Sequence, residues 1–486
     1  MISRLSSEHK ELLTYIFAVL IIAASTYIFN YYNPASVFWD ENYHIASAQK
    51  YLAGVMYMEP HPPLGKLFIA LGELILNPNE GIDTAYFLDT NYIKKFPEGY
   101  SFAGMRLFPT LFGGASAALF FLILYRFSRQ MQLSFLFTSF YLFANAFILQ
   151  SRSAMLESTQ MFFIFAAILW FAIIFDKEHK SYRDYFILGL FIGLATAVKL
   201  NGLILILLYP FLYFYRVEAL SIFLHVKQFL LQGLTVVAGL ILVFMAVFYM
   251  HFTLADTMGV KSYKASPEYK QIIKDKATAN PLHFSVMMMD NLNYIKDYSK
   301  TVPRYNPCKK VENGSLAATW PFGNKSINYR WGKKDGKVSY LYLQINPMIW
   351  FSVVFAMIMA FAMIISKFIF GLHVKEKRLF YLISTFSAMY ASYMITMFNI
   401  ERVMYLYHYF IALFFGVFVL FLLFNYLFKD AIEKESKVLN IAVIILVLEV
   451  IYCYYYFAPF TYYKPLTTME FFDRQWFDFW KLKPIL

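Results

Sequence analysis

Residues 405–428 read YLYHYFIALFFGVFVLFLLFNYLF and contain no Asp, Glu, Lys or Arg. A helix needs roughly 20 mostly apolar residues to cross the hydrocarbon core of a bilayer, and this stretch has that length. One such stretch would also suit the buried helix of a large soluble protein. The number of similar stretches along the chain therefore decides between the two.

Apolar windows of this kind recur along the whole chain, and we expect about 11 transmembrane helices. The weakest pair, 185–198 and 201–215, would reduce the count to ten if one kinked helix ran across both. The expected fold is an all-α polytopic membrane protein with its helices packed as a bundle. The predicted spans lie at 12–30, 105–125, 132–149, 158–175, 185–198, 201–215, 229–250, 347–371, 379–397, 405–428 and 439–458.

The composition agrees with a membrane protein and excludes several other classes. Of the 486 residues, 59% are hydrophobic and only 15% are charged, whereas about a quarter of a soluble domain is charged. Disorder is excluded by this hydrophobicity, and a disulfide-stapled scaffold by the presence of only two cysteines. The net charge of +12 could indicate a nucleic-acid partner, but the aromatic residues lie within spanning runs, so we expect none.

The distribution of basic residues predicts the topology, because short cytoplasmic loops are enriched in Lys and Arg. With the N-terminus in the cytoplasm and 11 spans, each short cytoplasmic loop is basic, whereas the short loops on the opposite face hold one cation each. The first span is expected to remain as a signal anchor. The predicted segments are an N-terminus and first span (1–30), a first extracytoplasmic loop (31–104), spans two to seven (105–250), a second loop (251–346), spans eight to eleven (347–458) and an extracytoplasmic tail (459–486).

Two adjacent carboxylates, Asp40 and Glu41, follow the first span directly. Acidic side chains at this depth are costly unless they are solvated or used. A helix cap is an equally open interpretation for Asp40, with the helix running on through Tyr51. Further along, Pro62-Pro63 predicts the start of a helix over 64–76 that lies along the membrane surface.

A set of motifs, in order along the chain, resembles the protein O-mannosyltransferase family of GT-C-fold membrane enzymes. The resemblance covers roughly residues 30–425, and the ordered set is more specific than any one motif. The motifs are Trp39-Asp40-Glu41-x-x-His44, Tyr51-x-x-Gly54, Glu59-x-His61-Pro62-Pro63-Leu64-Gly65-Lys66, Met105-Arg106-Leu107-Phe108-Pro109, Ser151-Arg152-Ser153-Ala154-Met155-Leu156-Glu157-Ser158, Val198-Lys199-Leu200-Asn201-Gly202, Trp320-Pro321-Phe322-Gly323, Gln344-Ile345-Asn346-Pro347-Met348-Ile349-Trp350 and Arg402-Val403-Met404-Tyr405-Leu406-Tyr407-His408-Tyr409.

The resemblance implies that mannose is moved, with inversion, from a dolichyl or polyprenyl phosphate to Ser/Thr hydroxyls of translocated proteins. It places the catalytic acid at Asp40, and Glu41 is the second candidate. This chain departs from the family at Glu59 and Glu157, where the family usually has Asp. The loop 251–346 is too short for the MIR domain of eukaryotic members, so the resemblance is to the shorter, mostly prokaryotic form. This favours a site on the extracytoplasmic face of a prokaryotic plasma membrane, and the ER membrane is the alternative.

The leaving phosphate of such a reaction needs fixed positive charge, and guanidinium groups bind phosphate through two parallel hydrogen bonds. Four cations, Arg106, Arg152, Lys199 and Arg402, fall at the outer ends of predicted spans. A single Arg at a helix end commonly reaches toward lipid head groups instead. As a set, the four are predicted to bind the donor phosphate.

The remaining candidate residues are expected on the sugar and acceptor side of the site: Glu59, His61, His44, His408 and Tyr407. The histidines match no strong metal-ligand spacing, so we expect no metal and no other cofactor. Cys308 and Cys453 both fall on the extracytoplasmic side, which leaves a disulfide open.

Two other classes of function remain open. One is a related GT-C enzyme that glycosylates a lipid or glycan, for example an aminoarabinose transferase that acts on lipid A. The other is a transporter or flippase, which should show repeat symmetry and discontinuous helices that this sequence does not indicate. Pairing of two copies as a dimer is an open expectation, because family members often pair.

Overall fold

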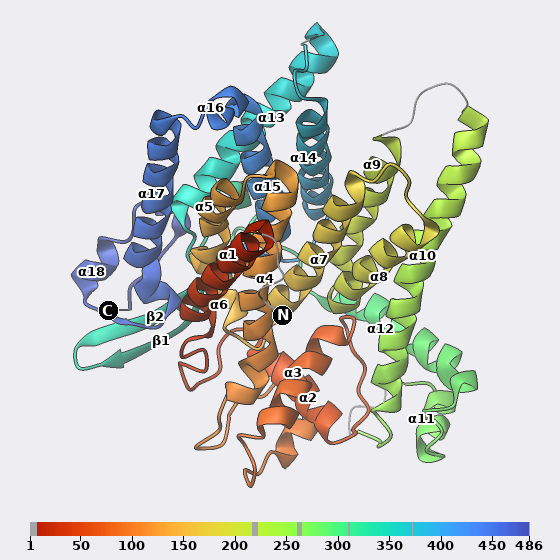
Figure 1. Cartoon of the computed structure of the whole chain (residues 1–486). Helices are drawn as coiled ribbons and strands as arrows, with labels where there is room; N and C mark the ends of the chain where they lie inside the picture. Colours follow the sequence, from red (N-terminus) through yellow and green to blue (C-terminus); the bar gives the residue numbers. More distant parts are fainter. Residues whose placement is uncertain (1–6, 216–221, 260–264, 310–311, 372, 486) are drawn as a thin grey trace.

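The computed structural model describes residues 7–215, 222–259, 265–309, 312–371 and 373–485, and the parts of the predicted segments at 1–6, 216–221, 260–264, 310–311, 372 and 486 lie outside them. Most of the described chain is helical, and the long helices pack side by side as a bundle (Figure 1). The expected fold class is therefore confirmed, with one small sheet as an addition.

Eight helical segments of the described chain are long and apolar enough to cross a membrane, or up to nine if a bent pair is one span. They are α1 with η2 (Ser7–Ile28), α4 (Ala103–Ser128), α7 (Glu157–Phe175), α10 (Ile222–Thr253), α13 (Pro347–Phe370), α14 (Lys377–Phe398), η8 with α15 (Leu406–Leu427) and α17 (Lys437–Thr461). The bent pair is α5 (Met131–Leu142) and α6 (Asn145–Ser151), which meet at 67°.

All 11 predicted windows fall on helices, and the lower count comes from the short windows. The window 185–198 forms α8 (Tyr182–Val198), and 201–215 forms η4 (Leu200–Leu207) with α9 (Leu208–Phe214). Lys199 between them has extended backbone, φ −149° and ψ 137°, so they are not one kinked helix. Gly202 packs directly on the backbone of Ala195, because a side chain there would meet Ala195 at 2.7 Å.

The bundle is held together by aromatic side chains at the centre of the membrane-spanning part. Phe120 of α4 contacts Phe165 of α7 at 5.5 Å between ring centroids, and it contacts Phe414 and Phe418 of α15 at 6.0 and 5.2 Å. Such pairs each contribute about 0.5–1.5 kcal/mol beyond their buried area. These contacts fix the positions of α4, α7 and α15 relative to one another.

The first long loop contains α2 (Glu41–Leu52), α3 (Leu64–Leu76) and η3 (Ala85–Asp89). The helix expected over 64–76 is present with those bounds. The second loop contains α11 (Pro267–Lys274), η6 (Pro281–His283), α12 (Phe284–Thr301) and η7 (Ala317–Phe322), followed by strands β1 (Asn328–Lys334) and β2 (Lys337–Tyr342).

The sheet is the part of the fold that an all-α prediction missed. Strand order is β1-β2-β3, all antiparallel, with Trp331 opposite Tyr340 and with β3 (Pro465–Leu466) joining from the tail. The β1–β2 turn is Asp335-Gly336, both with positive φ. An Asp-Gly pair between strands is the typical signal of a two-residue hairpin, so this element could have been predicted.

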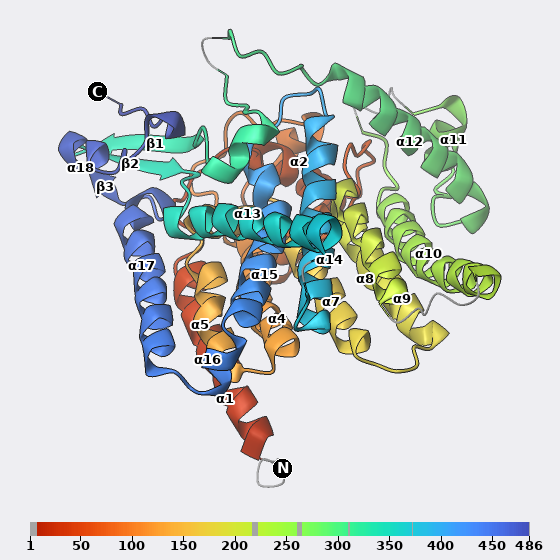
Figure 2. The ribbon, with the colours of Figure 1, turned by 90° about the horizontal axis from the view of Figure 1, so that it is seen from above.

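Figure 1 shows α2, α3 and α11 at one end of the bundle and α16 (Lys429–Glu433) at the other. Figure 2 shows the sheet with α18 (Thr468–Phe472) on one side and α11 with α12 on the other; η9 (Asp478–Trp480) lies near the C-terminus. The two long loops and the tail thus gather at the end of the bundle where the predicted catalytic residues lie.

Candidate active site

Asp40 stands immediately before α2, at the N-cap position, but its side chain makes no capping hydrogen bond. Its carboxylate instead accepts a hydrogen bond from the Tyr407 hydroxyl at 3.4 Å. The capping interpretation is therefore wrong for the side chain, although the helix itself forms as expected. Trp39, with φ 51°, provides the turn that directs Asp40 toward η8 (Leu406–Tyr409).

The surroundings of Asp40 favour the protonated form more than water does. Burial and, after it, the charge of Glu157 raise the pKa of the Asp40 carboxyl to about 6. Lys199, Tyr407 and Lys66 act in the opposite direction. A carboxylate with this pKa is ionised at neutral pH and is a stronger base than an ordinary Asp, as a general base should be.

Glu41, the neighbouring carboxylate, has a different environment from Asp40. It accepts two hydrogen bonds from Arg106, of 2.7 and 2.8 Å, and two more from the backbone N–H groups of Ala154 and Phe38. Both Glu41 and Arg106 are fully buried. With its oxygens saturated in this way, Glu41 is suited to hold the loop and not to accept an acceptor's proton.

Arg106 does not lie where its predicted role as a phosphate ligand requires. Its three donors that do not face Glu41 bind the carbonyl oxygens of Tyr32, Pro34 and Ser36, each at 2.8 Å. All five N–H groups of the guanidinium are thus occupied, so no donor is left for a phosphate. In this structure Arg106 fixes the segment between the first span and Asp40.

Arg152 occupies a similar structural position beside the first span. Its guanidinium donates to the carbonyl oxygens of Tyr27, Phe29 and Asn30 at 2.8–2.9 Å and lies over the ring of Tyr462. These carbonyls come from the last turn of the span and the residues after it, which lack intrahelical partners. The structure therefore gives Arg152 no contact with the other predicted phosphate ligands.

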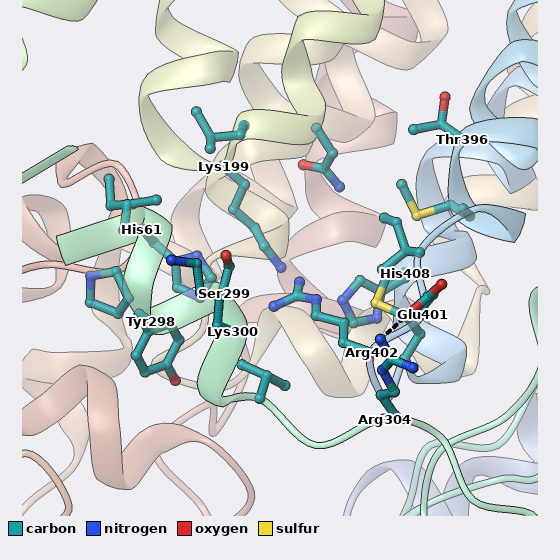
Figure 3. Close-up of a pocket in the computed structure, with 18 residues that line it drawn as sticks. His61, Lys199, Tyr298, Ser299, Lys300, Arg304, Thr396, Glu401, Arg402 and His408 are labelled. Carbon is teal, nitrogen blue, oxygen red and sulfur yellow. Dashed lines mark ion pairs between the residues drawn. The ribbon is translucent and has the colours of Figure 1, made fainter. Parts of the chain in front are cut away.

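Arg402 and Lys199 are the two predicted phosphate ligands that the structure brings together. They line one cavity of about 760 Å³, and in Figure 3 their charged groups point toward each other. Within the described residues the Arg402 guanidinium has neither a hydrogen bond nor an ion pair. Further lining comes from α12 and the end of α14, including Ile295, Tyr298, Met397 and Ile400.

Lys199 is held at the wall of this cavity by an acidic partner. Its ammonium lies 2.7 Å from Glu157 Oε1 and 5.6 Å from the ring centroid of Tyr407, the same residue that donates to Asp40. Tyr407 thus contacts both Asp40 and Lys199. It connects the Asp40 carboxylate to the cation at the cavity wall.

His408 and His61 also line the cavity. His408 Nδ1 interacts with the backbone of Tyr405, and its ring stacks on Trp320 and Tyr407. For His61, burial lowers the pKa well below its ordinary value, and the Lys199 charge lowers it further. His61 is therefore neutral at pH 7.

Glu59 and His44 do not line this cavity. Glu59 is fully buried, forms an ion pair with Lys66 at 2.6 Å and, within the described residues, leaves Oε2 without a hydrogen-bond partner. His44 is buried with Nδ1 unpartnered, and burial lowers its pKa well below the ordinary value. The predicted sugar-side residues are therefore divided: His61 and His408 line the cavity, Tyr407 lies beside its Lys199, and Glu59 and His44 are not part of the lining.

The described residues contain no group of three or more His, Cys, Asp or Glu side chains that could hold a metal ion. The expectation that the reaction uses none stays a prediction. Cys308 is exposed and Cys453 is buried, and both thiols are free.

The sequence prediction missed several residues that organise the site. Gln150 binds both Tyr329 and Glu157, while Lys66 acts on Asp40 from α3. Lys66 and Glu157 lay inside recognised motifs, so their charge was a usable signal. Tyr329 lies on a strand that was not predicted, and the signal for that strand was the Asp335-Gly336 turn after it.

Two protein-family models match this chain. The family model for dolichyl-phosphate-mannose-protein mannosyltransferase matches residues 17–255, and the model for the C-terminal four-helix transmembrane region of protein O-mannosyltransferase matches residues 295–480. Together the two models span most of the helical bundle of this polytopic membrane protein. The chain belongs to the protein O-mannosyltransferase family.

Curated relatives align over part of their length. The Candida albicans dolichyl-phosphate-mannose–protein mannosyltransferase 1 is 30% identical over 50% of this chain and 28% of its own. The Danio rerio protein O-mannosyl-transferase 1 is 26% identical over 53% of this chain and 37% of its own. The chain thus aligns with about a third of the length of these relatives.

Solved structures share the fold. A chain of the Saccharomyces cerevisiae Pmt1-Pmt2 protein O-mannosyltransferase complex, bound to the sugar donor, superposes with a TM-score of 0.84 at 15% identity and covers 97% of this chain and 92% of that one. The Archaeoglobus fulgidus oligosaccharyltransferase AglB superposes with a TM-score of 0.50 at 13% identity, covering 94% of this chain and 56% of that one.

Proposed function

We propose that this protein transfers mannose from a polyprenyl or dolichyl phosphate to the hydroxyls of Ser and Thr in acceptor proteins, with inversion at the sugar. The observation that carries the proposal is the arrangement of Asp40 beside Lys199 and the unpartnered Arg402. One carboxylate with a raised pKa thus senses the charge of Lys199, and Lys199 lines a single cavity together with Arg402. These are the charges that the reaction needs at its two ends.

In the proposed reaction, the acceptor hydroxyl oxygen attacks the anomeric carbon and Asp40 takes its proton. A new carbon–oxygen bond to the acceptor forms as the bond between the anomeric carbon and the phosphate oxygen breaks. The bonding electrons pass to the phosphate, which leaves as polyprenyl phosphate. Arg402 and Lys199 stabilise the negative charge that develops on it.

The remaining residues have supporting roles in this proposal. Glu41 with Arg106, and separately Arg152, hold the segment before Asp40. His61, His408 and Tyr407 contact the sugar or the acceptor. The apolar lining from Ile295, Met397 and Ile400 suits the first isoprene units of the donor.

The cellular setting is part of the proposal. The membrane is the plasma membrane of a prokaryote, and the site faces away from the cytoplasm. The assembly is a pair of chains, and support comes from the similar yeast structure, which is a complex of Pmt1 with Pmt2. Light scattering of the purified protein in detergent tests the pairing, and a single chain per particle would contradict it.

The deciding experiment follows the label. The purified protein is incubated with membranes and polyprenyl phosphate carrying radiolabelled mannose, and protein and lipid fractions are then separated. We expect the label in protein, with release by β-elimination under alkali. Label in lipid alone would favour the lipid-glycosylating alternative, and no transfer at all would contradict both. Asp40→Asn serves as the inactive control.

A further inference from the structure

Glu157 connects two parts of the site, although the reaction described above assigns it no step. It is the first residue of α7, and both of its carboxylate oxygens are used. Oε1 accepts from the Lys199 ammonium at 2.7 Å, and Oε2 accepts from the Gln150 amide at 2.8 Å. One carboxylate therefore links the cavity wall to α6.

The contacts continue from Gln150 to the residue before Asp40. Gln150 Oε1 accepts a hydrogen bond of 2.7 Å from the Tyr329 hydroxyl. The Tyr329 ring stacks on Trp39, with 4.9 Å between centroids and 18° between planes. Trp39 directly precedes Asp40. Arg330, which follows Tyr329 on β1, donates a hydrogen bond to the carbonyl oxygen of Val37 at 2.9 Å. Strand β1 thus contacts the Asp40 segment at two points.

We propose that Glu157 is a positioning residue, which fixes Lys199 at the cavity wall and, through Gln150 and Tyr329, orients the segment that carries Asp40. This inference rests on the proposed function, because it assigns a role relative to a base and a phosphate ligand. A buried residue that holds two reacting groups in place affects the rate strongly, since a misplacement of about 1 Å can cost on the order of 100-fold.

Glu157 also affects Asp40 through its charge. After burial, the Glu157 charge is the largest cause that raises the pKa of Asp40. If that charge is removed, the cations that face Asp40 remain and the pKa of Asp40 falls below about 6. The other titratable groups that face or sense Asp40 are Lys199, Lys66, Tyr407, Tyr43, Tyr298, Tyr329 and Tyr405.

The test compares Glu157→Gln with Glu157→Asp, using Glu376→Gln as the matched control. Glu376 is also an ion-paired Glu, bound to Lys429, and it lies at the other end of the bundle. Transfer is measured against pH and donor concentration in proteoliposomes, and folding by the thermal midpoint in detergent. We expect Glu157→Gln to lower kcat/KM for the donor by about 10-fold or more and to move the acid limb to lower pH.

The conservative variant separates charge from geometry. Glu157→Asp keeps the charge and should keep the acid limb near that of the wild type, while its shorter side chain lowers turnover. Tyr329→Phe removes only the hydrogen bond to Gln150, so it should lower kcat and leave the donor KM near that of the wild type. Glu376→Gln should behave as the wild type does.

Two results have distinct meanings. If the wild type transfers mannose and Glu157→Gln matches it within twofold in kcat/KM for the donor, with the acid limb at the same pH, the inference about Glu157 is overturned and the proposed function stands. If the folded wild type transfers no mannose, the proposed function is what fails. A Glu157→Gln protein that binds donor normally but keeps the wild-type acid limb also overturns the inference.

Discussion

The carboxylate of Glu41 and the guanidinium of Arg106 are joined by two hydrogen bonds, of 2.7 and 2.8 Å, and both side chains are fully buried. The side chain of Asp40, the preceding residue, accepts one long hydrogen bond, of 3.4 Å, from the part of the chain that the structure describes. The two adjacent acids thus suit different roles. Glu41 fixes the loop, whereas the Asp40 carboxylate is available to accept a proton. A pair of acids that looks equivalent in sequence is not equivalent in the fold.

This division predicts a loss of stability from Glu41→Gln. The substitution leaves the Arg106 charge buried without its counter-ion, and breaking a buried pair on one side costs about 3–5 kcal/mol. We expect a lower thermal midpoint in detergent and less folded protein in the membrane. Asp297→Asn is the control, because its pair with Lys300 is 65% exposed and such pairs contribute about 1 kcal/mol or less. Equal midpoints for Glu41→Gln and the wild type would contradict the structural role.

A second prediction concerns donor binding at Arg402. Arg402→Ala should raise the donor KM about 10-fold or more, and Arg402→Lys should restore only part of the loss, because an ammonium lacks the two-pronged geometry of a guanidinium. Donor titrations in proteoliposomes measure both. Lys309→Ala removes an exposed cation from the second long loop and should change nothing. A fully active Arg402→Lys would exclude bidentate phosphate binding at this position.

Much of the fold could be predicted from the sequence, because lipid imposes one simple requirement. Every long apolar run had to become a helix, so all 11 windows are helical. What length alone cannot show is whether a run stays straight. The break at Phe143-Ala144 and the extended Lys199 depend on packing against neighbouring helices, so α5 with α6 and the region around η4 differ from simple spans.

Only part of the candidate site could be predicted from the sequence, since two of the four predicted phosphate ligands bind backbone carbonyls instead of lining the cavity. The sequence shows that Arg106, Arg152, Lys199 and Arg402 sit at the outer ends of helices, but it does not show which backbone carbonyls they meet. In the fold, Arg106 and Arg152 donate hydrogen bonds to backbone carbonyl oxygens beside the end of the first span. Only Lys199 and Arg402 reach the cavity. The sequence thus predicts where the cationic side chains lie, but it does not predict which groups of the folded protein bind them.

The topology predicts opposite labelling of the two ends of the bundle. In a background with Cys308→Ser and Cys453→Ser, single cysteines replace Asp89, which is exposed in the first loop, and Glu433, which is 60% exposed on α16. A membrane-impermeant thiol reagent added to intact cells should label the Asp89→Cys variant and label Glu433→Cys only after lysis. Labelling of both positions from outside would defeat the topology and the side assigned to the site.

The proposed role of Asp40 as the base predicts that Asp40→Asn abolishes transfer and leaves folding intact. The amide keeps the size of the side chain but cannot accept the proton, and general-base catalysis is worth about 100- to 10,000-fold. Stability should change little, because the Asp40 side chain caps no helix. Initial rates and thermal midpoints measure the two effects. Asp89→Asn, an exposed Asp of the same loop, is the matched control, and a tenth or more of wild-type turnover in Asp40→Asn would exclude Asp40 as the base.

The pH dependence of transfer should report the same carboxylate. Since burial and Glu157 raise the pKa of Asp40 to about 6, the base form predominates above that pH and is lost below it. We therefore expect transfer to be level from about pH 7 upward and to fall about tenfold for each unit below 6. His44 and His61 do not account for such a limb, because their pKa values lie well below the ordinary value. The donor is a phosphodiester and keeps its single charge throughout this range, so donor titration is excluded as well.

Initial rates at saturating donor between about pH 4.5 and 8, with folding checked at each pH, measure the limb. A rate that stays constant down to about pH 5 would mean that the proton acceptor is a group with an ordinary carboxylate pKa, and the base would then have to be sought elsewhere in the site.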